Sequence, residues 1–127
     1  MNCIAHGIDC VEVERFRQLL TRRPRVVQKC FSDPEIKYSF RVSDPSERLA
    51  VRFAAKEAVL KALECGIGSV ALREIEVIRS SSGKPEIRLS GKALERSKNR
   101  GINHWIVSLT HTKSLSQASV IGLEKRG

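Results

Sequence analysis

Apolar residues recur with strand or helix spacing along most of the chain, and this pattern predicts the order of the elements. Residues 3–8 form a short apolar stretch, typical of a buried strand, that ends at Asp9. Apolar residues then follow helical spacing and predict a helix from about residue 11 to residue 21. The longest pattern, rich in alanine and leucine, predicts a helix over about 46–63, with Gly66 and Gly68 as stop signals.

Two short polar motifs resemble helix starts. Asp9-Cys10-Val11-Glu12 has the form of a capping box, in which Asp9 would cap the first helix. Ser32-Asp33-Pro34-Glu35 is a second capping box with proline in the first turn, and it predicts a helix that continues to about Phe40.

The second half of the chain favours strands. Residues 74–79 and 85–89 alternate as two strands of a hairpin around the glycine-containing turn 80–84. A short amphipathic helix is predicted over 91–100, followed by strands at 104–110 and 117–123 around a polar loop at 110–116. We therefore expect an α+β fold in which a mostly antiparallel sheet packs against the long helix, as a single domain over residues 1–127.

The composition indicates a globular, soluble protein that attracts anions. Of 127 residues, 41% are apolar and 29% are charged, and 23 basic against 14 acidic residues give a net charge of +9. Nucleic acids, nucleotides, acidic membranes and acidic proteins are all compatible partners of such a charge. The six aromatic residues (four Phe, one Trp and one Tyr) form no base-stacking platform, which argues against nucleic acid.

Neither the cysteines nor the N-terminus indicates an extracellular or membrane protein. The four cysteines contain no C-x-x-C pair, so the spacing of zinc ligands or of a redox motif is absent. No basic segment followed by an apolar one opens the sequence, and no apolar run approaches the roughly 20 residues that span a bilayer. We expect a cytoplasmic protein that makes no membrane contact.

The long predicted helix has two charged faces. Arg48, Arg52 and Lys56 lie on one stripe of this helix, where their positive charges repel one another. Either an anionic partner offsets this repulsion, or all three side chains extend into water. Glu57 and Lys61 are one turn apart and are compatible either with a surface ion pair or with a carboxylate that holds a hard cation beside a lysine that meets phosphate.

Four segments in order resemble one family. HGIDCVEVERF (6–16), RFAAKEAVLKA (52–62), SSGKPEI (81–87) and VSLTHT (107–112) are similar to the motifs of holo-acyl-carrier-protein synthases, the short single-domain branch of the 4'-phosphopantetheinyl transferases. The resemblance implies the fold of that family. It also implies magnesium-dependent transfer of the phosphopantetheine arm of coenzyme A to a serine of an acidic acyl carrier protein, with release of 3',5'-ADP, in fatty acid or polyketide biosynthesis.

The resemblance also assigns site residues. Asp9 and Glu57 would hold Mg²⁺, and Glu57 and Lys61 would act in catalysis. An N-cap role alone would also explain Asp9. The residues implied to bind coenzyme A are Arg52, Lys56, Lys61, Gly83, Lys84, Pro85, His111 and Thr112. Those implied to dock the carrier protein are Arg15, Arg22 and Arg25. Without the resemblance, His111 would be an ordinary surface residue.

The implied reaction is an in-line displacement at the β-phosphate of coenzyme A, in which the base is Glu57 or a metal-bound water. The resemblance further implies a homotrimer with active sites at the subunit interfaces, which suits a long ligand on a short chain. The alternative function is a non-catalytic, basic nucleic-acid-binding module, supported only by the net charge and the arginine stripe.

Overall fold

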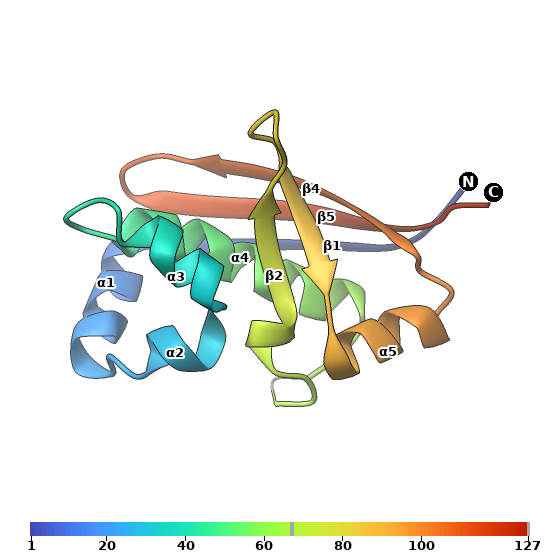
Figure 1. Ribbon diagram of the computed structural model, residues 1–127, viewed down its shortest axis with the longest axis horizontal. Coiled ribbons are helices and arrows are strands. Elements are labelled where there is room, and N and C mark those ends of the chain that lie inside the picture. Colours follow the sequence, from blue (N-terminus) through green and yellow to red (C-terminus); the bar gives the residue numbers. More distant parts are fainter. Residues whose placement is uncertain (67, 127) are drawn as a thin grey trace.

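The computed structural model describes residues 1–66 and 68–126 and contains the predicted helices and strands in the predicted order (Figure 1). The elements are β1 (Asn2–Glu12), α1 (Val13–Arg22), α2 (Val26–Cys30), α3 (Asp33–Ser39), α4 (Ser46–Ala62), the 3₁₀ helix η1 (Leu72–Glu74), β2 (Ile75–Arg79), β3 (Pro85–Leu89), α5 (Gly91–Asn99), β4 (His104–His111) and β5 (Leu115–Glu124).

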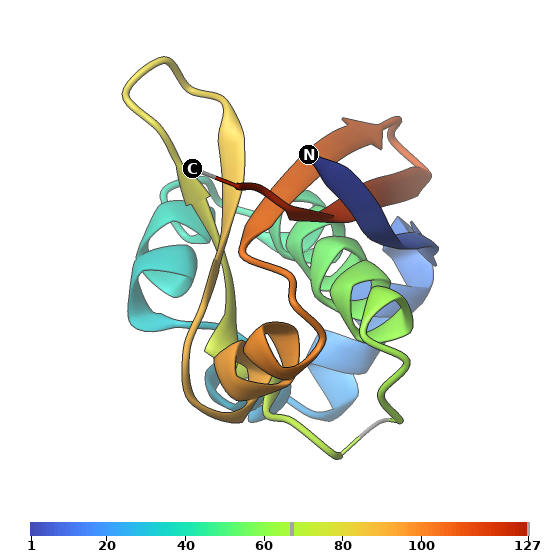
Figure 2. The same ribbon diagram turned by 90° about the vertical axis from the view of Figure 1, so that its right-hand side faces the viewer.

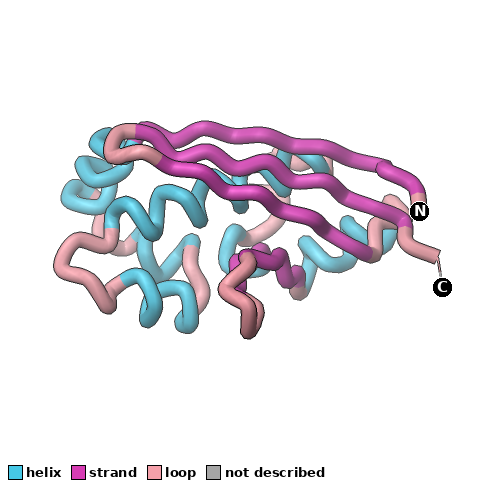
Figure 3. The backbone as a smooth tube through the Cα atoms, turned by 90° about the horizontal axis from the view of Figure 1, so that it is seen from above, coloured by secondary structure: helices cyan, strands magenta, loops and turns pink. Residues whose placement is uncertain are grey.

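The strands form two antiparallel sheets. One has three strands in the order β1-β5-β4, and the other is the β2–β3 hairpin. The helices of residues 1–66 and 68–126 lie on one side of the three-stranded sheet, and no described element covers its other face (Figure 3). The expected α+β fold with a sheet on a long helix is confirmed, and the predicted hairpin is separate from the main sheet.

Helix α4 is the centre of the core. It lies under the three-stranded sheet, with the β2–β3 hairpin beside it (Figure 2). Its small residues allow β1 to come very close: a Cβ at Gly7 would lie 1.9 Å from the carbonyl oxygen of Ala58. Only glycine permits this contact, because any side chain at residue 7 would collide with the helix backbone.

A second cluster of buried apolar residues joins the N-terminal helices to the N-terminal half of α4. Phe16 of α1, Phe31 and Phe53 pack with ring centroids 5.2–6.5 Å apart. This packing fixes α1 beside the end of β1 that contains Asp9, so that the residues of the first motif meet those of the long helix.

The start of α1 differs from the prediction. Strand β1 continues to Glu12, because residues 2 and 3 and residues 5–12 pair with β5 in register, and Asp9 lies inside this strand opposite Ala118. Glu12 is at the N-cap of α1 and makes no side-chain capping bond. The capping role of Asp9 is therefore wrong, since cross-strand pairing outweighs a local helix-start motif. The second capping box is confirmed, with Ser32 and Glu35 bonded reciprocally.

Other boundaries differ in smaller ways. Helix α4 ends at Ala62, and the chain reverses at Glu64 with a φ of +56°, before either predicted stop glycine. The expected loop at 110–116 is a tight turn, because the Thr112 amide donates to the Leu115 carbonyl at 2.8 Å and lets β4 and β5 extend. Helices α2 and η1 were not predicted. Among the described residues, no helix is long and apolar enough to cross a membrane.

Candidate active site

The two predicted metal ligands line one depression, which we call the carboxylate pocket. It has a volume of about 430 Å³. Its lining residues come from β1, α1 and α4, and they are Asp9, Cys10, Val11, Glu12, Arg15, Phe16, Leu19, Arg22, Phe53 and Glu57. Residues that are 48 positions apart in sequence thus present two carboxylates to the same space.

The electrostatics of this pocket favour a cation. Burial and the negative charge of Asp9 raise the pKa of Glu57, and the positive charge of Lys61 partly offsets this rise. The ammonium of Lys61 donates to Asp9 Oδ1 at 2.9 Å and to the carbonyl of Ile8 at 3.0 Å. The hydrogen bond to Asp9 raises the pKa of Lys61, so the lysine is charged at neutral pH.

The donor set of the carboxylate pocket fits Mg²⁺. Two carboxylates facing each other repel, and a divalent ion between them would relieve that repulsion. Within the described part of the chain no group of three or more His, Cys, Asp or Glu side chains could hold a metal by itself. Asp9 and Glu57 can therefore supply only part of a coordination shell, the arrangement in which Mg²⁺ keeps waters and binds substrate phosphate.

A second depression, the arginine pocket, contains several of the residues predicted to bind coenzyme A. Its volume is about 490 Å³, and it lies between α3, α4, the β2–β3 hairpin and the end of β4. The lining residues are Tyr38, Glu47, Arg48, Val51, Arg52, Val77, Arg79, Gly83, Pro85, Leu109 and His111. Arg52, Gly83, Pro85 and His111, which were predicted separately, are thus brought together.

Arginines surround Tyr38 in this pocket. The guanidinium carbons of Arg48, Arg52 and Arg79 lie 4.3, 4.6 and 5.0 Å from the centroid of its ring. Burial lowers the pKa of Arg52; the charge of Glu35 opposes this effect, and the charges of Arg79 and Arg48 add to it. The Nε of Arg52 is buried without a hydrogen-bond partner among the described residues. Guanidiniums clustered around one depression are typical of sites that bind phosphate.

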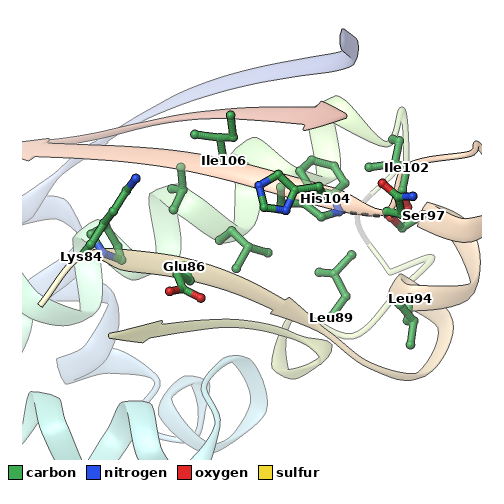
Figure 4. Close-up of a pocket in the computed structure, with 13 residues that line it drawn as sticks. Lys84, Glu86, Leu89, Leu94, Ser97, Ile102, His104 and Ile106 are labelled. Atoms are coloured by element: carbon green, nitrogen blue, oxygen red, sulfur yellow. Dashed lines mark hydrogen bonds between the residues drawn. The ribbon is translucent and has the colours of Figure 1, made fainter. Parts of the chain in front are cut away.

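Lys84 lies in a third depression between β3, α5 and β4, with a volume of about 390 Å³, which we call the hairpin groove (Figure 4). Lys84 and Glu86 come from β3 and the preceding turn, and His104 and Ile106 come from β4. Pro85 lines both the hairpin groove and the arginine pocket. The groove therefore adjoins the arginine pocket, although it is remote from the two carboxylates.

Lys56 does not have the position that its predicted role requires. Its side chain is fully buried, and its ammonium donates to Glu35 Oε1 at 2.7 Å and to the carbonyls of Leu72 and Ile75. All three of its protons are thus used inside the protein. The prediction that Lys56 contacts coenzyme A is not retained, and the residue instead connects α4 to α3 and β2.

The remaining predicted residues lie at different distances from these pockets. Arg15 and Arg22 line the carboxylate pocket, whereas Arg25 is exposed at the start of α2 and lines none of the three depressions. Thr112 follows His111 in the tight turn, where its hydroxyl accepts from the Leu115 amide at 3.1 Å. Thr112 thus holds the turn that positions His111.

Several pocket residues were missed from the sequence. Tyr38 and Arg79 of the arginine pocket lie 41 positions apart, and the hydroxyl of Tyr38 accepts a hydrogen bond from Arg79. No sequence signal linked them, because only the packing of α3 against the hairpin brings them together. Leu19 and Phe53, which pack against the second apolar cluster, also line the carboxylate pocket.

Known proteins resemble this chain along most of its length. The family model of the 4'-phosphopantetheinyl transferase superfamily matches residues 5–118. The holo-[acyl-carrier-protein] synthase of Syntrophus aciditrophicus is 42% identical over 117 residues, covering 91% of each chain. That of Natranaerobius thermophilus is 36% identical over 119 residues, covering 93% of this chain and 95% of its own.

A solved structure gives the same result. The Helicobacter pylori holo-[acyl-carrier-protein] synthase in complex with coenzyme A superposes with a TM-score of 0.81 at 29% identity. The match covers 93% of this chain and 99% of that chain. Sequence and fold therefore agree along nearly the whole length of the described residues.

Proposed function

Since the chain belongs to the 4'-phosphopantetheinyl transferase superfamily, we propose that it is a holo-acyl-carrier-protein synthase, which transfers the 4'-phosphopantetheine group of coenzyme A to a serine of apo-acyl carrier protein. The main support is the carboxylate pocket, in which Asp9 and Glu57 share one space with Arg15 and Arg22. The pocket thus combines ligands for a hard cation with a basic rim for an acidic protein. Because the chain belongs to this superfamily, we do not retain the alternative function of a nucleic-acid-binding module.

Asp9 and Glu57 are the proposed ligands of Mg²⁺. When bound, the ion would neutralise charge on the pyrophosphate of coenzyme A and so favour attack by the serine oxygen. The support is the donor chemistry: two carboxylates line one pocket, and burial together with the charge of Asp9 raises the pKa of Glu57. Magnesium would complete its shell with water and with phosphate oxygens of the substrate.

The arginine pocket is the proposed site of the nucleotide end of coenzyme A. Arg48, Arg52 and Arg79 would neutralise phosphate oxygens, and His111 at the end of β4 would add a donor on the other side of the pocket. Gly83 and Pro85 would cover the nucleotide from the hairpin turn. Lys84 lies in the adjoining groove, separated from the arginine pocket by Pro85, which lines both.

The proposed reaction is an in-line displacement. The serine oxygen of the carrier protein forms a bond to the β-phosphorus of coenzyme A, and the bond from that phosphorus to the departing 3',5'-ADP breaks. Glu57, which lines the carboxylate pocket, takes the serine proton. Lys61 places a positive charge beside Asp9 and neutralises phosphate charge as it moves to the leaving group.

Helix α1 is the proposed docking surface of the carrier protein. Arg15 and Arg22 project at the rim of the carboxylate pocket, and Leu19 and Phe53 supply apolar area between them. Arg25, beyond the end of α1, would extend the basic surface. A basic rim around an apolar centre suits an acidic helix that delivers its serine to the carboxylates.

We further propose a homotrimer whose active sites lie between subunits. The carboxylate and arginine pockets share no lining residue, and they lie at opposite edges of the β1-β5-β4 sheet. A cyclic arrangement would bring the β1 edge of one subunit to the β4 edge of the next. The uncovered sheet face, with Ile8 and Ile106 exposed by 48% and 42%, provides an apolar surface for this contact.

The decisive experiment is to incubate the protein with apo-acyl carrier protein, coenzyme A and Mg²⁺ and to measure the intact mass of the carrier. We expect the mass to increase by one phosphopantetheine, and we expect no increase in excess chelator. Full transfer in chelator would exclude the metal assignment. No transfer with any divalent metal, to carriers of both fatty acid and polyketide type, would exclude the function.

A further inference from the structure

Lys61 occupies the position of a cation at one of the proposed metal ligands. Its ammonium lies 2.9 Å from Asp9 Oδ1 and 3.0 Å from the Ile8 carbonyl oxygen. Glu57, the other ligand, lies one helical turn before Lys61 on α4. The negative charge of the two carboxylates is thus partly balanced by a cation that belongs to the protein.

This ion pair can open without disturbing the fold. The Lys61 side chain is 58% exposed, whereas that of Asp9 is 18% exposed. An ion pair with one partner in water is weak, and the lysine stem has several rotatable bonds. The ammonium can therefore leave Asp9 while the strand and the helix stay in place.

We propose that Lys61 is a resident counter-ion that a divalent metal must displace from Asp9, and that coenzyme A favours the exchange by accepting the released ammonium on a phosphate oxygen. The inference rests on the proposed function. A metal ion that entered with the lysine still in place would meet its positive charge at close range. Once phosphate accepts the lysine, that repulsion is replaced by attraction.

The exchange makes metal and coenzyme A bind cooperatively. If coenzyme A increases the affinity for the metal, the metal must increase the affinity for coenzyme A by the same factor. In the wild-type protein the metal alone should bind weakly, because it competes with Lys61. A variant without the lysine charge should lose most of this dependence on coenzyme A.

The test measures Mn²⁺ binding through the electron paramagnetic resonance signal of the free ion, without coenzyme A. We expect Lys61→Met to bind Mn²⁺ up to about fivefold more tightly than the wild type, because the metal no longer competes with the lysine for Asp9. Lys92→Met, which removes one exposed positive charge on α5, should have an affinity for Mn²⁺ within about twofold of that of the wild type. Lys61→Arg, which keeps the charge, should bind Mn²⁺ like the wild type.

A second titration in saturating coenzyme A completes the test. The affinity of the wild type for Mn²⁺ should increase strongly, and that of Lys61→Met should increase much less. Equal Mn²⁺ affinities of wild type and Lys61→Met without coenzyme A would overturn this inference and leave the transfer reaction and its metal dependence intact. Absence of Mn²⁺ binding to the wild type even with coenzyme A would overturn both this inference and the metal assignment. Melting curves for all variants show that they are folded.

Discussion

At the scale of the residue, two lysines five positions apart on α4 have opposite environments. Lys56 is fully buried and bonded to Glu35, whereas the side chain of Lys61 is 58% exposed beside Asp9. Burial lowers the pKa of Lys56, and the hydrogen bond to Asp9 raises the pKa of Lys61. The same residue type therefore has a structural role on one face of the helix and a proposed catalytic role on another.

Asp9→Asn should lower the rate of transfer by about a hundredfold or more, because it removes the charge that holds the metal, which is worth several kcal/mol in such sites. The fold should survive, since asparagine has the same shape and Asp9 does not cap a helix. Transfer is measured by the mass of the carrier protein, and folding by a melting curve.

The matched control is Asp33→Asn, which makes the same change at an aspartate whose side chain is 90% exposed and paired with Arg73. It should transfer at the wild-type rate. If Asp9→Asn were as active as this control, Asp9 would have no part in metal binding.

At the scale of the element, the site depends on how closely β1 approaches α4. Gly7 brings the strand against Ala58, and Asp9, two residues later on the same face of β1, then reaches Lys61 on the next turn of the helix. This close contact therefore decides how near Asp9 lies to the charged residues of α4.

Gly7→Ala should destabilise the protein by about 3 kcal/mol or more, since the new methyl would overlap the Ala58 carbonyl oxygen at 1.9 Å. Unfolding in urea measures the loss. Gly66→Ala is the control, because a Cβ there would have no described atom within 4 Å. Equal stabilities of the two variants would show that β1 and α4 are less close than the structure has them.

The buried pair of Lys56 and Glu35 joins α4, α3 and β2. Glu35 accepts hydrogen bonds from Lys56 at 2.7 Å and from the amides of Ser32 and Val77 at 2.9 and 3.0 Å. Lys56→Met should therefore cost about 3–5 kcal/mol of unfolding free energy, because it leaves a carboxylate buried without its cation.

Adding Glu35→Gln to Lys56→Met should recover part of that loss, since no uncompensated charge then remains buried. Urea unfolding of the wild type, both single variants and the double variant gives the coupling energy. If the losses of stability in the two single variants add up to the loss in the double variant, the buried ion pair does not exist in solution.

At the scale of the whole molecule, the positive charge of the chain should steer an acidic carrier protein. With a net charge of +9 and with Arg15 and Arg22 at the pocket, kcat/KM should fall as salt is raised from about 20 to 150 mM. Arg15→Glu should lower kcat/KM about tenfold and change the affinity for coenzyme A by less than about twofold.

Lys98→Glu, which makes the same change of charge at an exposed residue of α5, is the control for the net field. It should have a clearly smaller effect than Arg15→Glu. A kcat/KM that is independent of salt would contradict electrostatic steering.

The separation of the two pockets predicts complementation between inactive subunits. When Glu57→Gln and His111→Ala subunits exchange in equal amounts, about a quarter of shared sites should pair an intact carboxylate pocket with an intact arginine pocket. Transfer should return to that extent. Sedimentation should give a trimer.

The control mixes Glu57→Gln with Asp9→Asn, both in the carboxylate pocket, and should restore nothing. A monomer at working concentration, or no rescue despite demonstrated exchange, would exclude sites shared between subunits.

The sequence by itself determined most elements and the chemical groups of the site. The alanine-rich pattern of α4, the capping box at Ser32 and the hairpin around Gly83 depend on local periodicity and turn chemistry, which are encoded within a few residues. The four motifs likewise gave Asp9, Glu57 and Lys61 together with their family.

Only the tertiary structure decided which of these residues meet. It placed Asp9 in a strand, because pairing with β5 outweighs a local capping motif, and it buried Lys56, because Glu35 from another helix supplies a counter-charge. It also gathered Arg48, Arg52 and Arg79 around Tyr38. Each of these outcomes depends on contacts between residues far apart in the chain, whose free energies exceed the local preferences from which sequence patterns are interpreted.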